Sequence, residues 1–415
     1  MSIANAYPDQ PERLREVDPS RDVLSSNDQQ HWLTIADQLA ARLAESAVER
    51  DRLGGHASFE RELIRESGLL TLAVPSEYGG QGQPWSLVYH VVRRLARVDS
   101  ALAHVFAFHH LQVGSVLLYG NQHQQQRLLT ATAQEHLFWG NTLNPLDKRT
   151  VATERGNGGF ILQGKKGFCS GARGSDYLTV SAWHEPTQSL VIAAVPTHRP
   201  GITVHDDWDA IGQRQTDSGT VSFEQVEVLE SEVLLPPGFA WSPSAQFRAC
   251  LAQLVLVNLY VGIAEGAFEE AKRFTLEQGR PWLASEAAKA QDDPYLQRHF
   301  GELWVKLRSA QVLADIAGDI AQRHFVKRTA ISAENRGEAA IAIAEAKVVA
   351  HQAALDTSSR LFDIAGARAT ARTLGLDRFW RNARTHTLHD PVDYKIRDLG
   401  RWALLDQYPV PTSYS

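Results

Sequence analysis

The feature of this sequence that most constrains its fold is a change of hydrophobic pattern along the chain. Between Gln29 and about Arg127, apolar residues recur every three or four positions, as in WLTIADQLAARLAESAVERDRL, which is typical of amphipathic helices. From Phe138 to about Leu235 the segments are short, β-branched or alternating, and turn residues separate them, which is typical of strands. Helical spacing then returns and continues through ENRGEAAIAIAEAKVVAHQAALDTSSRLFDIAG. This order predicts an α+β fold of helices, a β domain and a helical bundle.

The domain boundaries that we predict follow the same pattern. A chain of 415 residues is long enough for two or three domains. Its polar first residues are expected to be disordered, as termini often are, and Pro409 and Pro411 make the end of the chain extended. A role of that tail as a lid is left open. The predicted parts are a terminal segment (1–28), an N-terminal helical domain (29–137), a β domain (138–238), a C-terminal helical bundle (239–400) and a tail (401–415).

Helix start signals add detail to this outline. The helical run between residues 87 and 120 is interrupted around Asp99, and Ser100 is a candidate cap for its second half. Asp293 and Pro294 predict the start of a later helix, as a cap and a first-turn proline.

Composition excludes several classes of protein. The net charge of -6 offers no basic face for nucleic acid or an anionic membrane, and no apolar run approaches the ~20 residues that span a bilayer. The first residues lack the apolar stretch of a signal peptide, so we expect a cytoplasmic protein. Cys169 and Cys250 are the only cysteines, which gives no disulfide framework. Met1 is the only methionine, and codon bias and synthesis under scarce sulfur are two alternative explanations for the lack of others.

The segment RTHTLHDP concentrates polar chemistry at one place. His386 and His389 lie three residues apart, close to one helical turn, and Asp390 with the helix-breaking Pro391 follows at once. The segment holds too few ligands for a typical metal site, so no metal is predicted. GxGxxG is absent, so no Rossmann nicotinamide site is indicated.

Three segments in this order resemble the acyl-CoA dehydrogenase superfamily over nearly the whole chain. VPSEYGGQG, IGQRQTDSGTVSFEQVEV and LFDIAGARATARTLGLDRFWRNART look like its loop, strand and Gly-rich flavin motifs. The resemblance implies a middle β-barrel or sandwich and a C-terminal four-helix bundle. The tetrad HDPV stands where the dehydrogenases carry a proton-abstracting glutamate, and THTLHDPVDYK and KGFCSGARGSD look like the flavin-dependent monooxygenase branch.

That branch implies a two-component enzyme. Such enzymes take reduced FMN from a separate NAD(P)H-dependent FMN reductase, bind O2, form a flavin hydroperoxide and transfer one oxygen atom. We expect a small organosulfur substrate, an alkanesulfinate such as methanesulfinate that becomes the sulfonate, and a homotetramer with neither nucleic-acid nor membrane partners. The alternatives are a dibenzothiophene-type heterocycle, an amine nitrogen, an FAD-dependent acyl-CoA dehydrogenase and a catalytically silent subunit.

The resemblance assigns catalytic roles to His389, Ser170 and Asn141. A histidine titrates near neutrality and can hold or return a proton, Ser170 would hydrogen-bond the flavin or its peroxide, and Asn141 would bind through its amide. A satisfied core histidine and a turn-capping serine are the structural alternatives. The predicted flavin contacts are Asn141, Thr142, Leu143, Asn144, Pro145, Leu146, Lys166, Gly167, Phe168, Cys169, Ser170, Arg280, Ala367, Arg368 and His389.

Within that set the side chains have different expected roles. Arg280 and Arg368 are candidate anchors for the FMN phosphate, which suits a guanidinium fork, and a surface arginine is the alternative for each. The resemblance implies that Arg280 contacts a flavin bound mainly by another subunit. Cys169 is expected to alternate away from Ser170 in a strand and to serve packing.

A substrate pocket is predicted beside the flavin. Phe108 stands where dibenzothiophene monooxygenases carry a tyrosine, which removes a hydroxyl from the expected pocket. The neighbouring histidines are candidates to face it, although a helix cannot direct all of them inward. The predicted pocket residues are His104, Phe108, His109, Trp139, Trp208 and His386.

Overall fold

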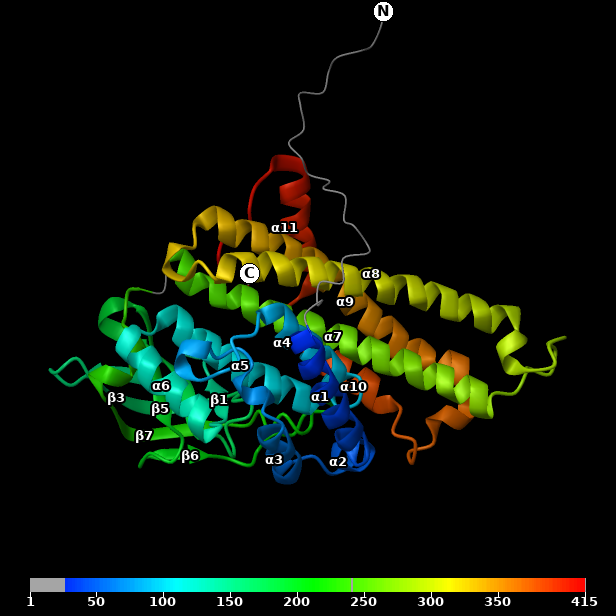
Figure 1. The fold of residues 1–415 in the computed structure, drawn as a ribbon, viewed down its shortest axis with the longest axis horizontal. Coiled ribbons are helices and arrows are strands. Elements are labelled where there is room, and N and C mark those ends of the chain that lie inside the picture. Colours follow the sequence, from blue (N-terminus) through cyan, green and yellow to red (C-terminus); the bar gives the residue numbers. More distant parts are fainter. Residues whose placement is uncertain (1–26, 240–241, 415) are drawn as a thin grey trace, which may run out of the picture.

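The computed structural model describes residues 27–239 and 242–414. The prediction for residues 1–28 therefore lies almost entirely outside the described residues. The elements follow the predicted order of helices, sheet and helices (Figure 1). The N-terminal helices are α1 (Asn27–Ala44), α2 (Ala47–Leu53), α3 (Ser58–Glu66), α4 (Trp85–Ala96), α5 (Ser100–Tyr119) and α6 (Gln122–Glu135).

Helix α5 lies at the centre of the N-terminal part. It starts after Asp99, whose carboxylate accepts hydrogen bonds from the backbone N–H groups of Ala101 and Leu102. The prediction that Ser100 caps this helix is wrong, because Asp99 satisfies the free N–H groups and the Ser100 hydroxyl accepts from Gln213 instead. Almost the whole length of α5 is buried.

The middle of the chain forms one mostly antiparallel sheet with the order β6-β7-β3-β2-β4-β5-β8, and β1 pairs with β4 in parallel. Alternation along β7, with Val221, Phe223, Val226 and Val228 buried, directs one face into the core. The strands are β1 (Trp139–Thr142), β2 (Val151–Glu154), β3 (Phe160–Lys166), β4 (Tyr177–His184), β5 (Ser189–Pro196), β6 (Ile202–Val204), β7 (Val221–Val228) and β8 (Val233–Leu235).

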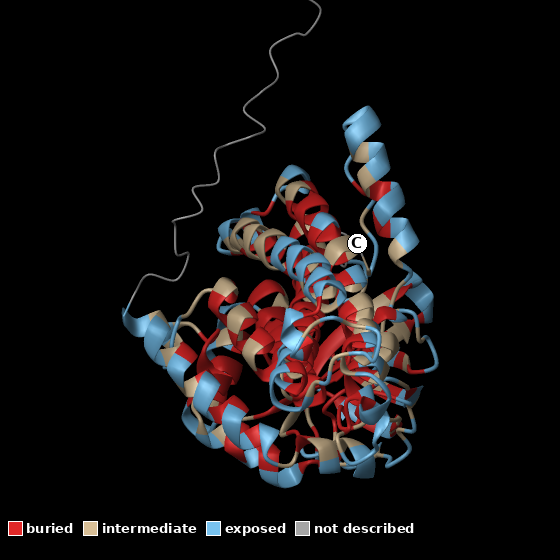
Figure 2. Cartoon of the chain, turned by 90° about the vertical axis from the view of Figure 1, so that its right-hand side faces the viewer, coloured by how far each residue is buried: buried red, intermediate tan, exposed pale blue. Residues whose placement is uncertain are grey.

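Three long antiparallel helices dominate the C-terminal part. Ser242, Asp293 and Ser332 cap their N-termini with side-chain hydrogen bonds, which confirms the predicted helix start at Asp293. Helix α10 packs on this bundle, whereas α11 projects from the body and is mostly exposed (Figure 2). The helices are α7 (Pro243–Gln278), α8 (Pro294–Phe325), α9 (Ala333–Ala365), α10 (Asp377–Thr387) and α11 (Val392–Leu405).

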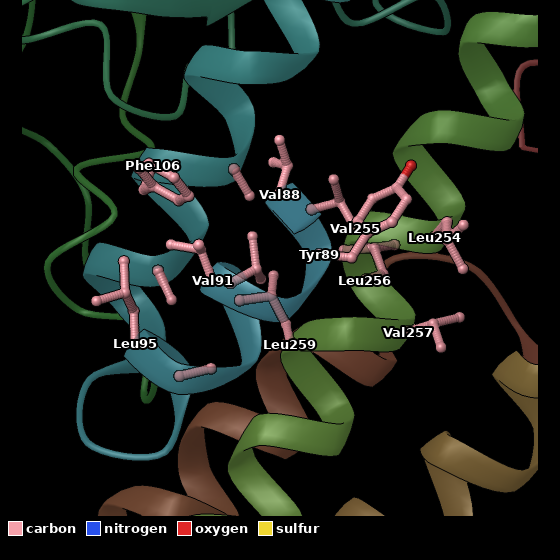
Figure 3. Packing of buried hydrophobic residues seen from close by; sticks show 14 of the residues in the cluster. Val88, Tyr89, Val91, Leu95, Phe106, Leu254, Val255, Leu256, Val257 and Leu259 are labelled. Carbon is pink, nitrogen blue, oxygen red and sulfur yellow. The ribbon is translucent and has the colours of Figure 1, made fainter. Parts of the chain in front are cut away.

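The main core lies where α4, α5 and α7 meet. Side chains from α4 and α7, including Val88, Leu95, Val255 and Leu259, interdigitate there and are fully buried (Figure 3). Burying one such side chain stabilises the fold by about 1.5–3 kcal/mol. Helices α5 and α7 are long and apolar enough to cross a membrane by composition, but in the fold these apolar windows are 100% and 94% buried. Their apolar character is explained by this core.

Candidate active site

One face of α5 carries a line of polar and aromatic side chains into the interior. His104, Phe108 and Gln112 are four residues apart, so they share one face of the helix. The rings of His104 and Phe108 stack with their centroids 4.0 Å apart. The Gln112 amide donates to the Phe108 carbonyl at 3.0 Å and to Oδ1 of Asn141 at 3.3 Å. This face of α5 therefore leads directly to β1.

Asn141 and Ser170 lie together where β1 meets the turn after β3. The Asn141 N–H donates to the Ser170 carbonyl at 3.0 Å. The Ser170 hydroxyl lies 2.8 Å from that of Ser218, and Ser218 donates to the Thr216 hydroxyl. A Cβ at Gly140 would lie 2.7 Å from the Ala172 Cα, so only glycine permits this approach of β1 to the turn.

The corner between α10 and α11 holds the histidine motif. Nδ1 of His389 lies 2.9 Å from Oδ1 of Asp390, and the Lys347 ammonium donates to the same oxygen at 2.6 Å. An ionised carboxylate only accepts hydrogen bonds, so the proton of a neutral His389 is on Nδ1 and Nε2 is the free nitrogen. His389 is 38% exposed in its side chain, whereas Asp390 and Lys347 are buried at 10% and 1%.

Asp390 is poorly suited to abstract a proton. Burial opposes its ionisation, but the hydrogen bond from His389 and the charge of Lys347 outweigh burial and hold the pKa of Asp390 well below its usual value. A carboxylate stabilised in this way is a weak base. Its role at this position is to orient His389, which contrasts with the catalytic glutamate expected of a dehydrogenase.

Two buried histidines join the α5 face to this corner. The rings of His104 and His386 meet edge to face with centroids 4.8 Å apart, and the Tyr260 hydroxyl donates to the His386 carbonyl. Burial lowers the pKa of His386 to about 3 and that of His104 well below its usual value, so both rings are neutral at working pH. Both ring nitrogens of His104 and Nδ1 of His386 are buried without a partner in the described part of the chain. Buried polar atoms of this kind are usually paired, so they fit a ligand.

Other predicted pocket residues lie elsewhere. His109 is fully buried, with Nε2 at 2.8 Å from the Leu70 carbonyl, and Nδ1 accepts from the Trp139 N–H. The Trp139 indole donates to Thr132. The structure gives both residues core packing roles and does not bring them to the cluster of His104 and His386. Each has its polar atoms satisfied.

The predicted flavin-contact residues differ in how far they are exposed. Leu143 is buried, whereas Leu146 and Phe168 are 69% and 68% exposed, and Phe168 meets Trp208 edge to face. The Lys166 ammonium, fully buried, donates to the Asn144 and Asp147 carbonyls and so fixes the loop that contains Pro145. The Thr142 hydroxyl donates to the Thr179 carbonyl.

We predicted that Cys169 lies in a strand, and this prediction is wrong. Cys169 lies in the turn that follows β3 and includes Gly167. Its side chain is buried, and burial raises the pKa of the thiol to about 12. The packing role predicted for this cysteine fits such an unreactive thiol.

The arginine pair lies far from the cluster within one chain. Arg280 follows the end of α7 and is exposed, and Arg368, next to Ala367, donates to the Gln278 carbonyl. A helix rises 1.5 Å per residue, so Arg280 lies roughly 30 Å along α7 from Tyr260. One chain therefore does not bring its own arginine pair together with its own histidine cluster.

The residues that support the histidine motif were not predicted from the sequence. Lys347 and Gln253 hold Asp390 from α9 and α7, and Gln112 links α5 to Asn141. A lysine inside the Ala-rich, nearly apolar run of α9 was the one signal that could have identified Lys347, because an unpaired ammonium is rarely buried. In the described part of the chain no group of three His, Cys, Asp or Glu side chains could hold a metal.

Family models match three consecutive parts of the chain. They describe the N-terminal (residues 26–136), middle (142–226) and C-terminal (254–394) domains of acyl-CoA dehydrogenase. The chain belongs to the acyl-CoA dehydrogenase family. The predicted fold class is therefore confirmed.

Individual relatives identify the branch. A probable FMNH2-dependent monooxygenase (SfnC) of Pseudomonas putida is 50% identical over 384 residues, 92% of this chain and 97% of its own. The structure of methanesulfinate monooxygenase MsuC from Pseudomonas fluorescens matches with a TM-score of 0.90 and 49% identity over 92% of this chain and 99% of that one. FMN-bound TdsC from Paenibacillus sp. A11-2 matches with a TM-score of 0.89 and 38% identity over 93% and 100%. These relatives confirm the FMNH2-dependent monooxygenase branch and FMN as its cofactor.

The residues of this chain fit FMN. A flavin has a flat ring system with polar edges and a phosphate on a ribityl chain. Exposed Phe168, the partnerless nitrogens of His104 and His386, and the exposed guanidinium of Arg280 offer the matching apolar, polar and cationic contacts.

Proposed function

We propose that this chain oxygenates a small alkanesulfinate, such as methanesulfinate, to the corresponding sulfonate. The reaction consumes one sulfinate, one FMNH2 and one O2, and yields the sulfonate, FMN and water. The observation that carries the proposal is the 49% identity with methanesulfinate monooxygenase over nearly the full length, against 38% with TdsC at similar coverage. Phe108, which lacks a tyrosine hydroxyl, also supports a different substrate from that of dibenzothiophene monooxygenases.

The bound flavin supplies activated oxygen, and the residues of this chain control protons and water around it. His389, held through Nδ1 by Asp390, offers Nε2 as a proton donor and acceptor. Ser170 and Asn141 supply hydroxyl and amide donors from the turn after β3 and from β1. The neutral, buried His104 and His386 add no charge of their own between these groups.

The enzyme depends on a separate reductase for FMNH2, and we propose an NAD(P)H-dependent FMN reductase for that role. We further propose a homotetramer, because Arg280 cannot serve the cluster of its own chain. Both proposals follow from the use of reduced FMN and from the length of α7.

The test supplies the purified protein with FMN, a flavin reductase, NADH and methanesulfinate under 18O2. We expect methanesulfonate that carries one 18O atom, detected by mass spectrometry. Dibenzothiophene is offered in a parallel reaction. Hydrogen peroxide without sulfonate would contradict the proposal, and sulfoxide from dibenzothiophene alone would transfer it to the heterocycle.

A further inference from the structure

Arg248, on the second turn of α7, carries a buried charge that has no role in the proposed reaction described above. The residue is only 9% exposed. Its Nε donates to the Ser115 hydroxyl at 2.6 Å and its Nη2 to Oε1 of Gln112 at 3.3 Å. Among residues 27–239 and 242–414, no carboxylate forms an ion pair with Arg248. Burial lowers the pKa of this guanidinium.

Some buried arginines of this fold are neutralised by carboxylates, whereas Arg61 and Arg336 donate to backbone carbonyls instead. Arg50 pairs with Asp99 and Glu60, and Arg93 pairs with Asp315. What distinguishes Arg248 from the other buried arginines without a carboxylate is its hydrogen bond to Gln112, which lies on the α5 face of the candidate site. Burying a cation without an anion costs several kcal/mol. An anionic ligand would remove that cost.

The position of Arg248 connects it to the candidate site. Gln112 accepts from Arg248 through its carbonyl oxygen and donates to Asn141 through its amide nitrogen, so one side chain touches both. Ala245, three residues earlier on the same face of α7, packs with Leu143 of the predicted flavin loop. Arg248 therefore lies beside the loop that begins with Asn141, at the end of the α5 face that starts with His104.

We propose that Arg248 is the residue that recognises the anionic sulfinate group of the substrate. A sulfinate has two oxygens that share one negative charge, and a guanidinium binds such a pair through two parallel N–H groups. The N-terminal end of α7 adds a partial positive charge nearby. A neutral sulfur heterocycle would leave this cation unpaired, so Arg248 selects sulfinates and their sulfonate products over neutral sulfides. This inference rests on the proposed function.

The test measures binding separately from turnover. Methanesulfinate is titrated calorimetrically into FMN-loaded protein, with Arg248→Met, Arg248→Lys and Arg378→Met as variants. Arg378, on α10, is a matched control: it is equally buried at 9% but donates to the carbonyl of Gly375, just before that helix. We expect Kd to rise about 100-fold in Arg248→Met, less in Arg248→Lys, and to change little in Arg378→Met. FMN affinity and thermal stability, measured on each variant, exclude a folding defect.

Each outcome separates the two proposals. If the Kd of Arg248→Met for methanesulfinate stayed within threefold of the wild-type value, the role of Arg248 would be overturned, whether or not sulfonate forms. Failure of the wild-type protein to bind methanesulfinate at millimolar concentration would overturn it too. Binding that depends on Arg248, without any sulfonate from the complete system, would support the anion site and contradict the proposed function alone.

Discussion

At the scale of single residues, His389 is the group whose loss should separate oxygen transfer from flavin oxidation. Removing a general acid or base usually costs 10²- to 10⁴-fold in rate, so His389→Ala should lower sulfonate formation by about that factor. NADH consumption should continue, with hydrogen peroxide as the product. The measurement is the ratio of sulfonate to peroxide per NADH, with His123→Ala on the exposed face of α6 as control. Unchanged sulfonate yield in His389→Ala would remove this residue from the mechanism.

Lys347 gives a pH dependence of known sign. Burial lowers the pKa of Lys347 to about 8, even though Asp390 opposes that shift. Above pH 8 the ammonium loses its proton, so Asp390 loses its cationic partner and the pair of Asp390 and His389 is held less firmly. We therefore expect kcat/KM to fall above about pH 8. Lys347→Arg keeps its charge at any such pH, so its profile should stay flat there; an unchanged alkaline fall in this variant would assign the titration to another group.

The same titration affects stability in the opposite direction. The folded protein releases the Lys347 proton near pH 8, whereas the unfolded chain keeps it until about pH 10.4. Between these values the unfolded state binds more protons, so this group contributes increasing stability as the pH rises. Denaturant unfolding at pH 7.5 and 9.5, compared between wild type and Lys347→Met, measures that contribution. If the free energy of unfolding of wild type, relative to that of Lys347→Met, fell between pH 7.5 and 9.5, the lowered pKa of Lys347 would be contradicted.

The histidine motif could be predicted from sequence, but its support could not. His386, His389 and Asp390 are contiguous, so their proximity follows from the chain itself. Lys347 is 43 residues from Asp390 and meets it only because α9 packs beside the α10–α11 corner. Likewise, Arg248 and Asn141 meet through Gln112, across three elements. Such contacts depend on tertiary packing, which local spacing does not encode.

At the scale of elements, the N-terminus of α5 shows which of two neighbouring residues caps a helix. Asp99 both caps the helix and forms a buried ion pair with Arg50. Asp99→Ala should destabilise the fold by about 3–5 kcal/mol, because it removes the helix cap and one of the two carboxylates that pair with the buried Arg50. Asp99→Asn keeps a capping oxygen and should cost less. Chemical denaturation measures both.

Ser100→Ala is the matched control for this prediction. It removes only the hydrogen bond from Gln213, so we expect a loss of about 1 kcal/mol. A loss equal to that of Asp99→Ala would restore Ser100 as the effective cap. Sequence could not decide between the two neighbours, because both residue types cap helices well and only the position of Arg50 distinguishes them.

Element types were more predictable than their pairing. Strands β3, β4, β5 and β7 follow from alternating, β-branched runs, and α8 follows from Asp293 and Pro294. The short β2 lacks such a run, and its parallel contact with β4 depends on partners distant in sequence. The pairing of β1 with β4, which positions Asn141, has the same origin.

At the scale of the whole molecule, one end of α7 exposes apolar surface beside the predicted phosphate anchor. Trp282 and Leu283 are 78% and 96% exposed, and both follow Arg280 in the chain. Large apolar side chains that cluster on a surface mark contacts with other chains. Because Arg280 lies roughly 30 Å along α7 from Tyr260, the proposed assembly would bring its charge to the flavin of a neighbouring subunit. Assembly and flavin binding should therefore fail together.

Replacing both Trp282 and Leu283 by Glu tests this. Two buried charges in a contact would cost several kcal/mol, so we expect the assembly to dissociate into smaller species by light scattering. FMN affinity should fall at least tenfold in the dissociated form, as it should in Arg280→Ala without dissociation. Leu53→Glu, at 70% exposure on α2, is the control and should leave both properties unchanged. An intact assembly in the double variant would show that Trp282 and Leu283 do not form the contact, and full FMN affinity in a monomer would show that each chain completes its flavin site alone.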